Sequence, residues 1–397
     1  MNMTKWTRRQ FSQALGLAAA GTLLPRSGFS MDTSVGTGTG KSGGLAFVGS
    51  DAPAGEDGAI HVFRVSDANW QHLQTVPAAA PGRILLHPTL PVLYALHNVG
   101  EWKHLPRGAV SAYGINSQSG QLTHLGSQPL SLSATFPRHA TLTAGGSHLF
   151  VSSGAGAMYN VLPVSPDGSL LAVAGIRKEF GVQDESGART AFPGAVAFMP
   201  DGTLLSVDAG QGAVNCFQLR GNDLTVQQRT PIQAGHGADK LAVAPCGLRA
   251  YALHPSGKLI TTLSLRERDP KRSQGMSSIK PEQTELMAQA VAKDLILAPG
   301  GSYLLAESEA LTDVLKIAPG TGLFVHHAQL RGAGEKLTFA AGMGLLGLDV
   351  STGAVRQTAF DAVHGTAAPS EIVAHVQNPV SLVFRPEGDL KPGMRAL

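Results

Sequence analysis

The sequence predicts an all-β fold, a seven-bladed β-propeller. The main reason is a repeated pattern, in which a short apolar strand ends in a turn rich in Pro and Gly and a second apolar strand follows. The clearest copy spans residues 137–153, where a Gly-Gly turn separates the two strands. Repetition at about 40 to 50 residues, with four short strands per repeat, is typical of propellers.

The copies follow one another along most of the chain. Equivalent turn positions fall at residues 87, 143, 199, 244 and 298, which gives steps of 56, 56, 45 and 54 residues. A weaker copy begins at Leu337, and residues 45–49 look like a first copy that lacks its opening strand. The seven copies predict seven blades in one closed ring.

The two ends of the repeat region are expected to complete one blade together. Residues 379–384 look like an opening strand with nothing after it, so we expect this strand to lie beside residues 45–49 and close the ring. The propeller is therefore predicted over residues 45–390, followed by a tail at 391–397. An insertion at 266–287 is expected to carry a short helix from Pro281 onward.

The first 30 residues resemble a twin-arginine export signal. Arg8 and Arg9 precede Phe11 and an apolar run at 14–24, which is too short for a membrane-spanning helix of about 20 apolar residues. The alternative is an ordinary amphipathic helix with chance arginines. Residues 31–44, rich in Gly, Ser and Thr, are predicted to be a flexible linker. We therefore expect a periplasmic protein without stable membrane insertion.

The composition argues against several classes of function. Charged residues make up 15% and the formal net charge is +3, without the clustered basic residues that nucleic-acid binding needs. Cys216 and Cys246 lie in different repeats and are expected to be packing residues, since neither a disulfide framework nor a metal-binding spacing is present. Phosphate-binding and serine-esterase motifs are also missing. We expect a monomer that binds a small molecule and needs no cofactor or metal.

Polar residues gather where the predicted strands begin and end, which should place them at one mouth of the central channel. His139 or His254 is expected to act as the base, oriented by Asp208 or Asp239, and the other members are expected to bind substrate. The alternative for each is a channel lining that contacts only water. The full set is His139, His254, Asp208, Asp239, Arg83, His97, Arg138 and Lys240.

Over residues 45–384, the chain resembles the seven-bladed propeller lactonases, of the 6-phosphogluconolactonase and carboxymuconate cyclase type. The resemblance rests on the Pro-Arg-His sequence at 137–139, on Val-Leu-Pro-Val-Ser-Pro-Asp-Gly-Ser-Leu at 161–170, and on residues 378–384. It implies hydrolysis of a small lactone at the channel mouth, with the same propeller fold.

Most positions that such lactonases use at this mouth carry other residues here. His139 matches, whereas Asp239 stands at an arginine position, and Pro255 and Glu309 replace a glutamate and an arginine. This exchange predicts a mouth that has lost positive charge, so we expect neutral lactones to be preferred over phosphorylated ones, with hydrolysis dependent on His139. The alternative is a catalytically degenerate propeller that binds a ligand or a protein without turnover.

Overall fold

The computed structural model describes most of the predicted propeller. The described residues are 43–52, 58–66, 69–184, 187–232, 238–254, 258–265, 279–285 and 291–390. The proposed signal segment (1–30), residues 31–42 of the proposed linker and the proposed tail (391–397) lie outside them. The described residues belong to one compact unit.

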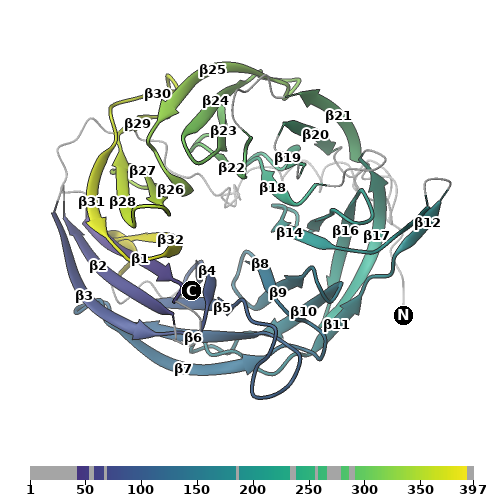
Figure 1. Cartoon of the computed structure of the whole chain (residues 1–397). Coiled ribbons are helices and arrows are strands. Elements are labelled where there is room, and N and C mark those ends of the chain that lie inside the picture. Colours follow the sequence, from purple (N-terminus) through teal and green to yellow (C-terminus); the bar gives the residue numbers. More distant parts are fainter. Residues whose placement is uncertain are drawn as a thin grey trace, which may run out of the picture. The chain divides into compact units, whose positions relative to one another are not determined.

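Seven four-stranded antiparallel sheets follow one another around a ring, as Figure 1 shows. The first three sheets, from the inner strand outward, are β32 (Pro379–Pro386), β1 (Gly43–Ser50), β2 (Ala59–Ser66) and β3 (Asn69–Pro77); β4 (Pro81–Leu86), β5 (Val92–His97), β6 (Ala109–Ile115) and β7 (Leu122–Pro129); and β8 (Pro137–Leu142), β9 (His148–Ser153), β10 (Met158–Pro163) and β11 (Gly175–Lys178).

The chain continues in the same direction around the ring (Figure 1). The other four sheets are β14 (Pro193–Phe198), β15 (Leu204–Asp208), β16 (Ala213–Arg220) and β17 (Asp223–Pro231); β18 (Lys240–Val243), β19 (Arg249–Leu253), β20 (Leu259–Leu265) and β21 (Ile279–Glu285); β22 (Asp294–Leu297), β23 (Tyr303–Glu307), β24 (Leu311–Ile317) and β25 (Phe324–Arg331); and β26 (Glu335–Ala340), β27 (Gly344–Asp349), β28 (Ala354–Thr358) and β31 (Glu371–His375).

Three small elements complete the described structure. They are the hairpin of β12 (Val182–Asp184) and β13 (Gly187–Arg189), the hairpin of β29 (Phe360–Asp361) and β30 (Thr366–Ala367), and the 3-10 helix η1 (Glu387–Leu390). No helix among the described residues is long and apolar enough to cross a membrane.

The C-terminal strand closes the ring, which confirms the prediction from the two ends of the repeat region. β32 pairs antiparallel with β1, and Val48 lies opposite Leu382. It also contacts the next blade, because Ser381 Oγ donates a 3.0 Å hydrogen bond to the carbonyl oxygen of Pro81. The inner strands touch in the cyclic order β32, β4, β8, β14, β18, β22, β26 and back to β32. In a closed ring every blade therefore has a neighbouring blade on both sides.

The hydrophobic core is divided among the junctions between blades. Seven separate clusters of buried residues each combine side chains from two neighbouring sheets. Alternating strand residues supply the two faces of every sheet, so each blade packs against the blade before it and the blade after it. The junction across the ring closure brings Ala46 and Phe384 together with Leu346. Packing of this kind predicts that removing one strand weakens the whole ring.

Two local expectations were wrong. Pro281 lies in β21, the outer strand of its sheet, rather than in a helix; an edge strand tolerates Pro because the missing N–H would face solvent. Cys246 is exposed in the turn before β19, whereas Cys216 is buried as expected, and burial raises the pKa of its thiol to about 12.

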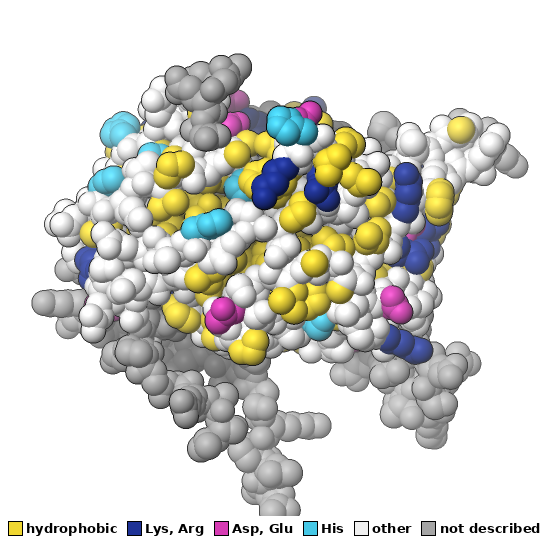
Figure 2. All heavy atoms as spheres, turned by 90° about the horizontal axis from the view of Figure 1, so that it is seen from below, with side chains coloured by type: hydrophobic (Ala, Val, Ile, Leu, Met, Phe, Trp, Pro, Cys, Tyr) yellow, Lys and Arg dark blue, Asp and Glu magenta, His cyan; other side chains and the backbone are white. Residues whose placement is uncertain are grey.

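Figure 2 shows charges of both signs scattered among apolar and histidine side chains on one face of the protein.

Candidate functional site

A cavity of about 510 Å³ lies where the inner strands begin. Its wall is built from the first residues of the inner strands, among them Arg83 of β4, His139 of β8, Lys240 of β18 and Lys336 of β26. All seven inner strands contribute to this wall. The volume is in the range of small-molecule sites, so this end of the channel can hold a compact ligand.

β-Bulges set the direction of two of these side chains. The register of β4 with β5 shifts between Pro81 and Arg83, and that of β8 with β9 shifts between Pro137 and His139. A bulge inserts one residue into a strand and turns the following side chains. Both prolines are buried and follow a residue with positive φ, Ala80 at 38° and Phe136 at 50°. The Pro-initiated inner strand is thus the local feature that presents Arg83 and His139 to the cavity.

His139 is the buried titratable group that the sequence placed at the centre of the site. It is 9% exposed and lines the cavity. Burial, followed by the positive charges of Arg83, Lys240, Arg138 and Lys336, lowers the pKa of His139 well below its usual value. The imidazole is therefore neutral at physiological pH, which is the form a general base needs, and the same cations make it a weaker base than an ordinary histidine.

Cations outnumber carboxylates in the wall, which holds Asp294 and Glu307 beside four Lys and Arg side chains. Arg83, Arg138 and Lys336 have no carboxylate within salt-bridge distance among the described residues, and Arg138 lies 6.0 Å from the centre of the Phe192 ring. The fourth cation, Lys240, pairs with Asp239 at 2.9 Å. Three cations that lack a carboxylate partner among the described residues favour a ligand that carries, or develops, negative charge.

Glu307 is a site residue that the sequence analysis did not select. The residue is 2% exposed and lines the cavity, and its carboxylate accepts hydrogen bonds from the backbone N–H groups of Lys336 (3.2 Å) and Leu337 (2.8 Å). Burial, and then the nearby charge of Asp294, raise the pKa of Glu307 to about 7. Its position at the end of β23, equivalent to that of His97 at the end of β5, is the signal that could have identified it.

Four of the eight predicted residues line this cavity, namely Arg83, Arg138, His139 and Lys240. The other four do not. Asp239 stays beside the wall, as the partner of Lys240.

Three predicted residues are held away from this cavity by hydrogen bonds, which corrects the expectation of a single cluster. Asp208 accepts 2.8 Å hydrogen bonds from the N–H groups of Phe192 and Gln211, and His254 is 2.8 Å from Thr261 Oγ1. His97 bonds to Ser111 and lines a different cavity. Burial raises the pKa of Asp208, which fits a structural rather than a solvent-facing carboxyl group.

The predicted loss of positive charge at the mouth does not hold for the described residues. Glu309 is 74% exposed, does not line the cavity and pairs with Lys293 at 3.3 Å. Asp239 is neutralised by Lys240, and Pro255 lies outside the described residues. Lys336, which the sequence analysis did not consider, adds a cation instead. Within the described part, no group of three or more His, Cys, Asp or Glu side chains could hold a metal ion.

Comparison with known proteins places this geometry in a family. The family model described as a lactonase with a 7-bladed β-propeller matches residues 45–317. The chain belongs to this lactonase family. A search of the curated proteins gives no match.

Solved structures found in a separate comparison share the fold of this chain. The periplasmic gluconolactonase of Pseudomonas aeruginosa is 20% identical, with a TM-score of 0.73 over 87% of this chain and 99% of its own. A candidate 6-phosphogluconolactonase of Bacteroides fragilis is 19% identical, with a TM-score of 0.73 over 88% and 99%. Its counterpart from Bacteroides uniformis is 17% identical, with a TM-score of 0.73 over 86% and 99%. At these identities the likeness shows the fold alone.

Proposed function

We propose that this chain is an exported lactonase that hydrolyses a small, negatively charged lactone in the central channel. The observation that carries the proposal is His139, a buried and neutral imidazole that shares one cavity with Arg83, Arg138 and Lys336, three cations without a carboxylate partner in the described part of the chain. Lactone hydrolysis needs a base for water and positive charge for the oxyanion. These residues supply both.

The reaction follows from these groups. An imidazole nitrogen of His139 takes a proton from water as the water oxygen attacks the lactone carbonyl carbon. The cations of the wall stabilise the oxyanion that forms. The ring C–O bond then breaks, and the proton returns to the departing alkoxide to give a hydroxy acid. Glu307, with a pKa near 7, is a second group able to donate a proton at neutral pH.

Export is supported by two features. The twin-arginine-like segment around Arg8 and Arg9 precedes the propeller, and the same fold occurs in a periplasmic gluconolactonase. The proposed location is therefore the periplasm, with the propeller folded before transport.

The deciding experiment compares glucono-1,5-lactone with its 6-phosphorylated form, with hydrolysis followed by acid release and corrected for the spontaneous reaction. We expect the wild type to hydrolyse the phosphorylated lactone faster, and His139→Gln to lose at least about a hundredfold in kcat/KM. His375→Gln, on the exposed outer strand β31, is the matched control and should retain wild-type activity. Hydrolysis of both lactones at the buffer rate, with the ligand still bound, would instead establish a binding propeller without turnover.

A further inference from the structure

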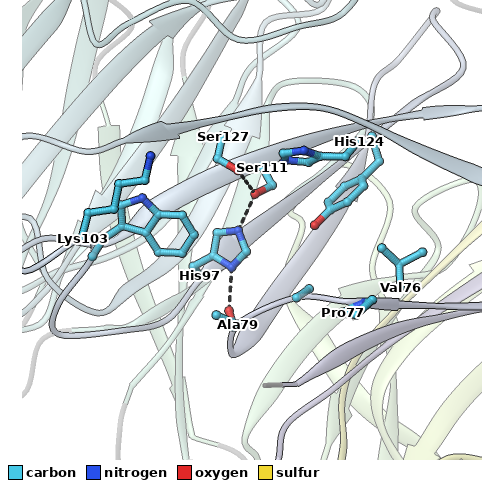
Figure 3. Close-up of a pocket in the computed structure, with 11 residues that line it drawn as sticks. Val76, Pro77, Ala79, His97, Lys103, Ser111, His124 and Ser127 are labelled. Atoms are coloured by element: carbon cyan, nitrogen blue, oxygen red, sulfur yellow. Dashed lines mark hydrogen bonds between the residues drawn. The ribbon is translucent and has the colours of Figure 1, made fainter. Parts of the chain in front are cut away.

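A second cavity, of about 450 Å³, lies between the first two blades and shares no lining residue with the channel site. One wall comes from the end of β3 and the residues after it, and the other from β5, β6 and β7. The loop after β5 supplies Trp102 and Lys103. Figure 3 shows the lining side chains around the cavity, with Lys103, His97 and His124 among those labelled. The volume falls in the range of small-molecule sites.

Two pairs of rings form much of the wall. The Trp102 indole stacks on the His97 imidazole, with ring centroids 4.7 Å apart and an angle of 29° between the ring planes. The ring centroids of Tyr113 and His124 lie 5.3 Å apart. Trp102 is fixed by its loop, because Trp102 and Leu105 exchange two backbone hydrogen bonds of 3.0 and 3.2 Å. A rigid aromatic wall binds a ring-shaped ligand at little cost in side-chain entropy.

A chain of hydrogen bonds fixes the protons of the polar wall (Figure 3). His97 Nδ1 lies 2.6 Å from the carbonyl oxygen of Ala79, which can only accept, so Nδ1 carries the hydrogen. Nε2 of a neutral His97 then accepts from Ser111 Oγ at 2.6 Å. Ser111 Oγ consequently accepts from Ser127 at 2.7 Å, and Ser127 accepts from Nε2 of His124 at 2.9 Å. The remaining nitrogen of a neutral His124, Nδ1, is an acceptor.

Two exposed side chains at the rim of the cavity therefore present an acceptor and a donor. The acceptor is Nδ1 of the exposed His124, and the donor is the ammonium group of the exposed Lys103, which carries the one formal charge among the described lining residues. A carboxylate cannot donate to His124, and an ammonium group cannot accept from Lys103. A hydroxyl group does both, and the apolar C–H face of a sugar ring packs on aromatic side chains.

We propose that this cavity is a binding site for a neutral saccharide, in which the sugar ring packs against the aromatic wall and its hydroxyl groups bond to His124 and Lys103. The site is independent of the channel and of the proposed hydrolysis. It gives the molecule a second ligand, taken up between the blades rather than along the ring axis.

Saturation-transfer NMR on the folded protein tests this proposal, with methyl β-glucoside, methyl β-galactoside and methyl α-mannoside as probes, and benzoate as a planar anion. We expect saturation transfer to the ring protons of at least one glycoside. Trp102→Ala and His124→Phe should each weaken its binding about tenfold. Leu105→Ala changes an exposed residue of the same loop that does not line the cavity, so it should bind like the wild type.

His139→Gln separates the two sites, since it leaves this cavity intact and should not alter glycoside binding. If Trp102→Ala does not fold, His124→Phe at an exposed position carries the test alone. Three results would overturn the proposal. They are no saturation transfer to any glycoside, equal saturation transfer in the wild type and both cavity variants, or displacement of the glycoside by benzoate at a concentration below that of the glycoside.

Discussion

The carboxylate of Glu307, at the end of β23, accepts a 2.8 Å hydrogen bond from the backbone N–H of Leu337 in the neighbouring blade. This bond ties two blades together at the wall of the central cavity and holds a buried acid beside the cations of the channel. An acid in this position responds to pH within the physiological range, since its pKa is about 7. The first prediction concerns that response.

The folded-state pKa of Glu307 is raised from 4.5 to about 7, so the folded protein binds more protons than the unfolded chain between these values. This contribution to stability is complete below pH 4.5 and is lost as pH rises to 7, by up to about 3 kcal/mol. We expect Glu307→Gln to lack this decline in urea unfolding measured at pH 4.5, 6 and 8. Glu371→Gln, exposed on β31, should unfold with the wild-type pH profile. An identical slope for all three proteins would contradict the prediction.

His139 should act in the opposite direction. Its folded-state pKa lies well below 6.5, so the unfolded chain takes up a proton that the folded protein resists, and stability falls as pH drops below 6.5. We expect His139→Gln to lose less stability than the wild type between pH 7 and pH 5, measured by urea unfolding. His375→Gln is again the control. Parallel loss of stability in His139→Gln and the wild type would show that the imidazole is not buried as described.

Closure of the ring is tested by removing β32. Truncation before Pro379 exposes the edge of β1 and the apolar face of the last junction, so we expect aggregation on purification or a large loss of stability. A milder variant, Phe384→Ala, removes one buried ring and should cost about 3 to 5 kcal/mol in unfolding free energy. A truncated protein with the wild-type melting temperature would refute the closing role of this strand.

The cations of the channel should discriminate between substrates by charge. We expect Arg83→Gln and Lys336→Gln each to raise KM for the phosphorylated lactone about tenfold and KM for the neutral lactone by no more than about twofold, while the loss of oxyanion stabilisation lowers kcat on both substrates. Activity on the phosphorylated substrate should also fall with added salt. Arg331→Gln, at an exposed position on β25, is the control. Equal increases in KM for both lactones would place the charged group of the substrate elsewhere.

Export is tested in cells rather than on the purified protein. Changing Arg8 and Arg9 to Lys should leave the protein in the cytoplasm, still folded, because the proposed signal depends on that pair. Fractionation followed by immunoblotting measures the outcome. Periplasmic recovery equal to that of the wild type would rule out the twin-arginine route.

The repeat pattern alone was sufficient to predict the propeller, its seven blades and the closing strand. Each copy carries its own turn chemistry, such as the Pro-Asp-Gly sequence at 200–202, and its own alternation of apolar residues. Such signals are local to each repeat. Because each repeat forms one blade and neighbouring blades pack face to face, seven repeats form a ring. The same pattern correctly placed Arg83, Arg138, His139 and Lys240 at the beginnings of inner strands.

The tertiary structure decided which polar side chains share a cavity. His97, Asp208 and Glu307 all end second strands, yet Glu307 alone among these three lines the channel. Its carboxylate bonds to the backbone of the next blade, whereas His97 bonds to Ala79 and Ser111 in a different cavity and Asp208 bonds to the backbone N–H groups of Phe192 and Gln211. These hydrogen bonds join residues far apart in sequence, as do the charges that depress the pKa of His139. No local sequence pattern encodes these hydrogen bonds and charge interactions, so the charge of the channel mouth follows only from the tertiary structure.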